Sequence, residues 1–173
     1  EATRDYVLRL DAPTGGAPLL SVFGGKITTY RRLAEAALEK LDRVLPEARG
    51  AWTATAPLPG GDFPHDGVAA QVSALRAAHP YLDGKEAHRL VRSYGTRAQR
   101  MLAGAASAGD LGPRFGPSLT GREVRYLIAQ EWALTADDVI WRRSKLGLGM
   151  TAADVERLEA FMGNEIAALG ITG

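Results

Sequence analysis

The segment from Leu19 to Arg31 contains the residues with the clearest chemical potential in this chain. It reads LLSVFGGKITTYR, an apolar run followed by two glycines, a lysine and two threonines. Glycine permits positive φ and a close approach of the backbone to a ligand, as expected at Gly24 and Gly25. Free amides at the start of a following helix, together with Lys26, would attract an anion or the polar edge of a cofactor. The segment therefore predicts an anion or cofactor site.

A helix is expected directly after this turn. Apolar residues recur there at 3.6-residue spacing and would form one buried face, made of Tyr30, Leu33, Ala34, Ala37, Leu38, Leu41, Val44 and Leu45. We expect Thr28 and Thr29 to cap its N-terminus. Arg31 and Arg32 lie in the first turn, where the helix macrodipole disfavours cations. Either an anionic ligand attracts them, or they project into solvent and pair with acids such as Glu35.

Two short strands are expected before the turn, over residues 5–10 and 18–23. Two strands do not form a stable sheet by themselves. We therefore expect the chain to be a fragment whose sheet is completed by residues outside it. A glycine- and proline-rich stretch follows the helix. It predicts a linker at 47–64 between a first domain at 1–46 and a second at 65–173.

The second domain is expected to be all helical, which makes the fold mainly α with short N-terminal β-strands. Three of its helices should begin at a threonine followed three positions later by an acid, as in a capping box: Thr120 with Glu123, Thr135 with Asp138, and Thr151 with Asp154. Two of these helices carry apolar stripes that we assign to the core. The stripes comprise Val124, Leu127, Ile128 and Trp132, and Val155, Leu158, Phe161, Met162, Ile166 and Leu169.

The composition excludes several classes of function. With 21 basic and 20 acidic side chains among 173 residues, the chain has no basic patch typical of nucleic-acid binding, and we expect no nucleic-acid partner. Without cysteine it has no disulfide and no cysteine-ligated metal. The three histidines lie in different expected segments, so no metal site is predicted. No apolar run approaches the roughly 20 residues that span a bilayer.

A second glycine motif, GLGMTA at residues 147–152, formally matches a dinucleotide-binding fingerprint. It follows a helical pattern rather than a strand, and no acid lies about 20 residues further on to bind a ribose. We therefore interpret it as a turn before the cap of the last helix.

A basic cluster lies just before that motif, and its members are Arg142, Arg143 and Lys145 beside Trp141. It would either contact phosphate or an anionic membrane, or complement the dipole at a helix C-terminus. The adjacent acids Asp137 and Asp138 are interpreted as helix-start residues rather than as a catalytic pair.

Two motifs identify a resemblance, SVFGGKITTYRRLAEAALEKL in the first domain and DDVIWRRSKLGL in the second. Both resemble the C-terminal portion of the bacterial FAD-dependent, quinone-linked glycerol-3-phosphate dehydrogenases, and the resemblance extends over essentially the whole chain. Ile27 stands where that family often has leucine.

The resemblance implies oxidation of glycerol 3-phosphate to dihydroxyacetone phosphate, with hydride transfer to FAD and electrons passed to ubiquinone. It implies that the cofactor-binding residues are Gly24, Gly25, Lys26, Ile27, Thr28 and Thr29. It also implies that Arg4 and Lys26 bind the substrate, and it assigns no catalytic base.

The same resemblance implies a cytoplasmic enzyme, peripheral to the inner membrane, whose FAD domain precedes this chain in the same polypeptide. Because the chain has no strand, glycine turn and helix of the dinucleotide-binding type, we expect it alone neither to retain FAD nor to be active. Two alternatives stay open. The helical domain is an interaction module for homodimer or membrane contact, or the chain belongs to another amino-acid-oxidase-like flavoprotein with a different small substrate.

Overall fold

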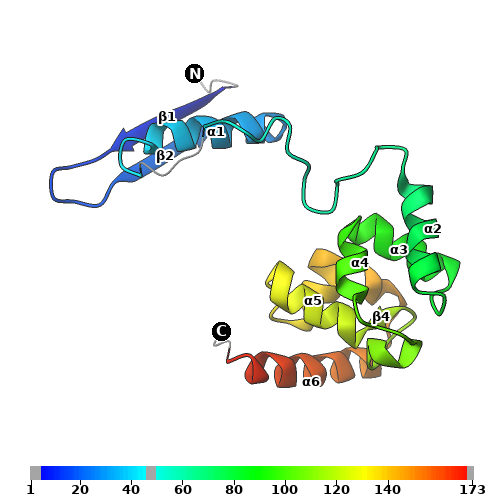
Figure 1. Cartoon of the computed structure of the whole chain (residues 1–173). Coiled ribbons are helices and arrows are strands. Elements are labelled where there is room, and N and C mark those ends of the chain that lie inside the picture. Colours follow the sequence, from blue (N-terminus) through cyan, green and yellow to red (C-terminus); the bar gives the residue numbers. More distant parts are fainter. Residues whose placement is uncertain (1–4, 46–49, 171–173) are drawn as a thin grey trace. The chain divides into compact units, whose positions relative to one another are not determined.

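The computed structural model describes residues 5–45 and 50–170 of the chain. The chain divides into two compact units, Glu1–Pro57 and Leu58–Gly173. Strands occur mainly near the N-terminus and helices make up most of the rest, as Figure 1 shows. The expected fold class, mainly α with short N-terminal strands, is confirmed.

The first unit begins with an antiparallel hairpin of β1 (Tyr6–Asp11) and β2 (Leu19–Gly24). The register places Tyr6 opposite Gly24 and Asp11 opposite Leu19. The connection is closed by a hydrogen bond of 3.0 Å from the Gly16 amide to the Pro13 carbonyl. Both strands lie within one residue of the expected ranges.

Helix α1 (Tyr30–Leu41) follows a 3-10 turn, η1 (Ile27–Thr29), and packs against β1. The helix ends earlier than the expected end near Leu45. The amides of Val44 and Leu45 both donate to the Leu41 carbonyl at 2.8 Å, which closes a tight turn in place of a further helical turn. Among the described residues of this unit none is buried.

The boundary between the units falls after Pro57, inside the range 47–64. The end of that range packs on the second unit, where the Thr96 amide donates to the Gly60 carbonyl at 3.1 Å. Gly60 and Gly95 have positive φ, at 85° and 55°. A Cβ on either glycine would collide with the backbone of the other segment, so both positions need glycine.

The second unit consists mostly of helices: α2 (Val68–Ala78), α3 (Gly84–Tyr94), α4 (Arg97–Leu102), η2 (Ala108–Leu111), α5 (Gly121–Glu131), the π-helical η3 (Asp138–Arg143), η4 (Leu146–Gly149) and α6 (Ala152–Ala168). It also contains a two-residue ribbon of β3 (Arg114–Phe115) and β4 (Leu119–Thr120), which the sequence did not suggest. Gly116, with φ of 58°, and Pro117 turn the chain between these strands.

Two clusters of buried side chains form the core of this unit. One comes mainly from α2, α3 and α4: Leu75, Leu82, Ala87, Leu90, Val91, Ala98, Met101, Leu102, Ala105 and Leu111. The other comes mainly from α5, η3 and α6: Phe115, Leu119, Val124, Leu127, Ile128, Ala133, Ala136, Val139, Ile140, Leu158 and Met162. Tyr94 and Tyr126 pack against both clusters. The two rings contact each other edge to face, with centroids 5.4 Å apart.

The threonine caps are present at all three expected positions. The Thr120 hydroxyl accepts from the Glu123 amide at 3.3 Å. Thr151 and Asp154 form a reciprocal capping box at the start of α6. Thr135 and Asp138 bond in the same reciprocal way, but the segment that follows is π-helical. A short polar motif therefore predicts where a helix begins, although it does not determine the type of helix.

Trp132 contradicts the expected core stripe. Its backbone is left-handed, with φ of 52° and ψ of 37°, and its side chain is 82% exposed. The Ala133 amide donates to the Leu127 carbonyl at 3.1 Å, which closes the end of α5 as in a Schellman motif. This closure takes Trp132 off the helical stripe. Leu169, at the end of α6, is also exposed rather than buried.

Candidate functional site at the glycine turn

The glycine turn, residues 24–29, connects β2 to α1. Gly24 and Gly25 have φ of 74° and 104°, in the region where residues with a Cβ are strained. A Cβ on Gly25 would lie 3.7 Å from both Leu33 Cδ2 and Tyr6 Cβ, which is ordinary van der Waals contact. Backbone conformation, and not lack of space, therefore requires glycine at this position.

The predicted threonine caps of α1 are wrong in their geometry. Thr29 is the N-cap residue, but its side chain accepts no cap hydrogen bond. Its hydroxyl instead donates back to the Lys26 carbonyl at 2.9 Å, and its amide donates to the same oxygen at 3.0 Å. The intervening 3-10 turn causes this difference, because the Thr29 hydroxyl and amide both bond to the Lys26 carbonyl before the α-helix begins.

Three consecutive amides in the turn have no acceptor in the described part of the chain, those of Lys26, Ile27 and Thr28. All three residues are exposed, and Ile27 is 90% exposed. The Lys26 ammonium forms no ion pair with any described residue. The turn thus presents amide donors and one cation to the surface, which suits an anion or an electron-rich heterocycle edge.

The two arginines of the first helical turn have different surroundings. Arg31 pairs with Glu35 at 3.0 Å, and its guanidinium also donates to the Thr53 hydroxyl at 3.3 Å. Arg32 is exposed and has no ion pair among the described residues. Of the two interpretations left open by the sequence, pairing with Glu35 holds for Arg31. Arg4, the other expected substrate contact, lies outside the described residues.

The Thr53 hydroxyl donates to Glu35 Oε1 at 2.5 Å. The hydrogen bond from Thr53 is the main cause that lowers the pKa of Glu35; desolvation opposes it, and the charge of Arg31 lowers the pKa further. Glu35 therefore holds both Arg31 and the segment after α1. No sequence pattern pointed to this arrangement, because Glu35 and Thr53 are 18 residues apart.

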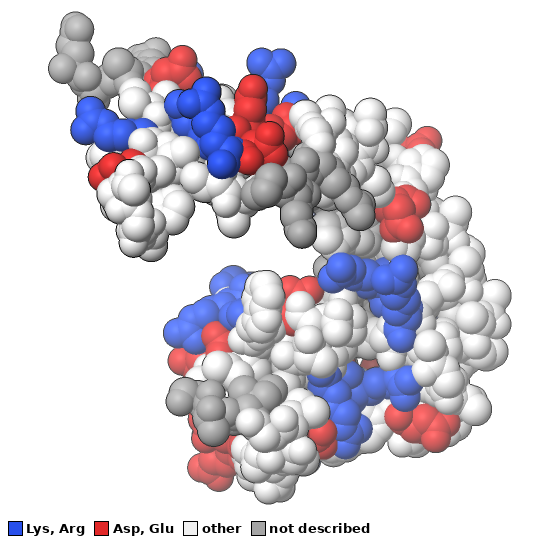
Figure 2. Space-filling model, turned by 60° about the vertical axis from the view of Figure 1, so that its left-hand side comes forward, with Lys and Arg blue, Asp and Glu red and all other residues white. Residues whose placement is uncertain are grey.

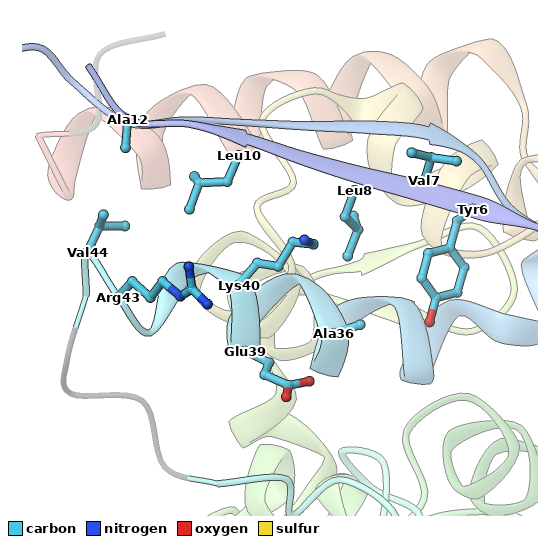
Figure 3. Close-up of a pocket in the computed structure, with 10 residues that line it drawn as sticks. All are labelled: Tyr6, Val7, Leu8, Leu10, Ala12, Ala36, Glu39, Lys40, Arg43 and Val44. Atoms are coloured by element: carbon cyan, nitrogen blue, oxygen red, sulfur yellow. The ribbon is translucent and has the colours of Figure 1, made fainter.

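A groove of about 870 Å³ lies between β1 and α1 (Figure 3). Figure 3 shows Leu8 and Leu10 directed toward α1, with Lys40 extending toward β1. Glu39 and Arg43 also line it. None of its lining residues belongs to the glycine turn, so the groove is not part of that candidate site. It is instead a gap in the packing of the first unit.

In the second unit the most concentrated polar group is a buried carboxylate. Glu123 is 2% exposed and accepts from Arg89 Nη1 and Nη2, each at 2.7 Å, and from Tyr94 Oη at 2.7 Å. Arg89 also donates to the Ser118 carbonyl at 2.9 Å. Burial first, then the Glu123 charge, raises the pKa of Tyr94, so its hydroxyl stays protonated. Every oxygen of Glu123 is occupied, which indicates a structural role.

The basic cluster near Trp141 has internal partners. Arg142 and Arg143 pair with Asp138 at 3.1 and 3.0 Å, and Arg143 also donates to the Glu131 carbonyl at 2.7 Å. Lys145 donates to the Trp141 carbonyl. These contacts support the dipole and helix-end interpretation, and Asp138 acts as a cap rather than in a catalytic pair.

Basic and acidic side chains are interspersed on the face shown in Figure 2. No group of three or more potential metal ligands occurs among residues 5–45 and 50–170. Within the same residues no helix is long and apolar enough to cross a membrane. The GLGMTA motif forms the 3-10 turn η4 followed by the cap of α6, and Trp141 packs on Gly147. The described part of the chain therefore leaves the glycine turn as the main candidate site.

Comparison with known proteins decides the family. Residues 51–167 match the model of the C-terminal domain of alpha-glycerophosphate oxidase. This chain belongs to that family. The family resemblance seen in the sequence is thereby confirmed.

Relatives of this family member extend the match into the first unit. The chain is 48% identical over 163 residues to glycerol-3-phosphate dehydrogenase of Pseudomonas aeruginosa, covering 94% of this chain and 32% of that protein. It is 46% identical over 152 residues to D-erythritol 1-phosphate dehydrogenase of Brucella abortus, covering 88% and 30%. It is 42% identical over 162 residues to aerobic glycerol-3-phosphate dehydrogenase of Escherichia coli, covering 92% and 32%. The chain thus spans about a third of the length of these curated relatives.

Proposed function

We propose that this chain is the C-terminal part of an FAD-dependent enzyme that oxidises glycerol 3-phosphate to dihydroxyacetone phosphate and passes the electrons to a quinone. The observation that carries the proposal is the 48% identity to a glycerol-3-phosphate dehydrogenase over 94% of the chain. Because the alignment covers 94% of this chain, it includes the glycine turn. The FAD-binding domain is assigned to the part of the polypeptide that corresponds to the remaining length of these relatives.

The glycine turn fits one edge of a flavin. Its free amides at Lys26, Ile27 and Thr28 are consecutive and exposed, and they precede the N-terminus of α1. Such donors stabilise negative charge, as develops on the pyrimidine edge of an isoalloxazine when it accepts electrons. FAD, when bound, supplies the hydride acceptor. Gly24 and Gly25 would allow the backbone to turn toward it without strain.

Lys26 has a second role in the proposal. Its ammonium is exposed, without an ion pair among the described residues, and adjacent to the free amides. We assign it, with Arg4, to binding the phosphate of the substrate or stabilising charge on the alcohol oxygen during oxidation. A cation is needed there because the substrate carries a phosphate dianion near the reacting carbon.

The packing of the first unit supports a position against further protein. None of its described residues is buried, and several large apolar side chains are more than half exposed: Val7, Leu19, Phe23, Ile27, Tyr30, Leu38, Leu45 and Trp52. A two-stranded hairpin with one helix is too small to be stable alone. We assign the covering partner to the FAD domain of the same polypeptide.

A second substrate deserves a direct comparison, because a relative 46% identical is a D-erythritol 1-phosphate dehydrogenase. Both compounds are polyol phosphates with a secondary alcohol, so the same cations and amides would serve either one. The full-length enzyme should be assayed with each at matched concentrations, with product analysis. A higher kcat/KM for glycerol 3-phosphate supports the leading proposal, and a preference for the erythritol compound selects the second.

The decisive variant is Lys26→Ala in the full-length enzyme. Loss of a charge-assisted contact should lower kcat/KM for glycerol 3-phosphate about 100-fold, equivalent to ~2.7 kcal/mol. Lys85→Ala, which removes an exposed lysine of α3, is the matched control and should leave kcat/KM unchanged. Unchanged kinetics in Lys26→Ala would remove Lys26 from the site.

The proposal includes a cytoplasmic enzyme at the periphery of the inner membrane with ubiquinone as acceptor. Flotation of the chain with liposomes, with and without anionic lipid, tests whether the helical unit contributes to membrane contact. Binding that requires anionic lipid assigns membrane contact to this chain. No flotation in either case leaves scaffolding or homodimer contact as the role of the helical unit.

A further inference from the structure

The connection between the two units is anchored at its N-terminal side by Thr53. The Thr53 hydroxyl donates to Glu35 Oε1 at 2.5 Å and accepts from Arg31 Nη1 at 3.3 Å. Both partners belong to α1, where they also pair with each other at 3.0 Å. These three side chains form a closed triangle that holds the chain on α1 as far as Thr53.

The same connection is anchored again a few residues later, this time on the second unit. The Gly60 carbonyl accepts from the Thr96 amide at 3.1 Å, and the Thr96 hydroxyl donates to Asp62 Oδ1. Gly60 and Gly95 approach so closely that neither tolerates a Cβ. The Gly61 amide also closes a turn onto the Leu58 carbonyl at 2.7 Å. The chain is therefore held by the second unit from Leu58 onward.

Four residues remain between the two anchors, Ala54 to Pro57. Within the described residues these four form no hydrogen bond. Pro57 fixes its own φ, and prolines at 57 and 59 restrict the residues before them to extended conformations. Ala54 and Thr55 lie in a turn, and neither a proline nor a hydrogen bond between described residues restricts their torsions.

We infer that, within the described residues 50–64, the hinge between the units is confined to Ala54–Thr55. The anchor at Thr53 limits the hinge on one side, and Pro57 with the Gly60 contact limits it on the other. The glycines at 60 and 61 serve close packing rather than flexibility.

Limited digestion of the full-length enzyme with elastase tests this inference, because elastase cleaves after small residues and the described part of the stretch contains Ala51, Ala54 and Ala56. Cleavage after Ala56 is blocked by Pro57. Intact-mass analysis should show a cut at Ala54–Thr55 that is about tenfold faster than any other cut between residues 50 and 64, since proteolysis follows local opening. A faster cut after Ala51, or one within 58–64, would overturn the inference.

Two variants test the first anchor itself. Thr53→Val removes the hydroxyl that joins Glu35 to Arg31 and should raise cleavage after Ala51 to a rate comparable with that at Ala54. Thr55→Val is the matched control, because Thr55 is exposed and unbonded within the described residues. If Thr53→Val leaves the Ala51 cut as slow as in the parent, Thr53 is not an anchor. Circular dichroism of each variant checks that the helices are retained.

Discussion

Replacement of Glu123 by glutamine tests whether the buried ion pair holds the helical unit together. In the parent, both carboxylate oxygens bind the Arg89 guanidinium at 2.7 Å and one also accepts from Tyr94. Glutamine has nearly the same shape but supplies an amide donor where an acceptor is needed. One N–H group of the guanidinium would then face another donor, and the arginine charge would lose its counter-charge in the protein interior.

The expected loss can be estimated from this geometry. Removing one member of a buried ion pair destabilises a protein by about 3–5 kcal/mol. The Arg89 side chain is 22% exposed, so water can partly replace its partner and the lower end, ~3 kcal/mol, applies. The unit from Leu58 to Gly173 has 116 residues by subtraction. At about 2.1 cal/mol/K per residue, its unfolding entropy is ~240 cal/mol/K, so Tm should fall by about 12 °C.

Thermal unfolding followed by far-UV circular dichroism measures this shift, since most of the helices belong to the second unit. Glu159→Gln makes the same chemical change on the exposed surface of α6 and should leave Tm within about 2 °C of the parent. A double-mutant cycle with Arg89→Met should give strong coupling between the two positions. If Glu123→Gln has the same Tm as the Glu159→Gln control, the ion pair does not stabilise the fold and the reasoning is refuted.

Two further predictions concern the ends of α5 and η3. Hydrogen bonds from the Leu134 amide and from Thr135 hold the pKa of Asp138 down at about 2, against 3.8 for a free carboxyl. Because this pKa is lowered in the folded state, ionised Asp138 stabilises the fold above the unfolded-state pKa, and this stabilisation is lost as pH falls through the folded-state value. The fall in Tm between about pH 4 and pH 2 should therefore be shallower in Asp138→Asn. An equal pH dependence in both proteins would contradict this. Trp132→Gly should raise stability by about 1 kcal/mol, because glycine accepts φ of 52° without strain and little buried area is lost from a side chain that is 82% exposed. Chemical denaturation measures the change, and a loss of stability would mean that the indole packs in solution.

Sequence patterns correctly predicted the features that depend on residues close together in the chain. The hairpin ends where glycines begin, and each threonine cap involves residues three positions apart. The pairing of Arg89 with Glu123 joins residues 34 positions apart, and its geometry depends on how α3 packs against α5. Trp132 fits the apolar period of α5, and only the closure of the helix end removes it from the core. Long-range packing and helix termination are therefore the steps that periodicity alone does not capture.

In the first unit, too, the sequence pattern and the structure differ in which side chains are buried. The period of α1 is that of a helix with one buried face, yet Leu38 and Tyr30 on that face are more than half exposed. An amphipathic pattern records which face is covered in the functional assembly, whereas the structure describes what this chain covers by itself. The exposed face of α1 lies in the same unit as the turn amides that have no acceptor among the described residues. Under the proposed function these two features have one explanation, because an FAD domain that buries this face of the helix would also bring the flavin to the turn.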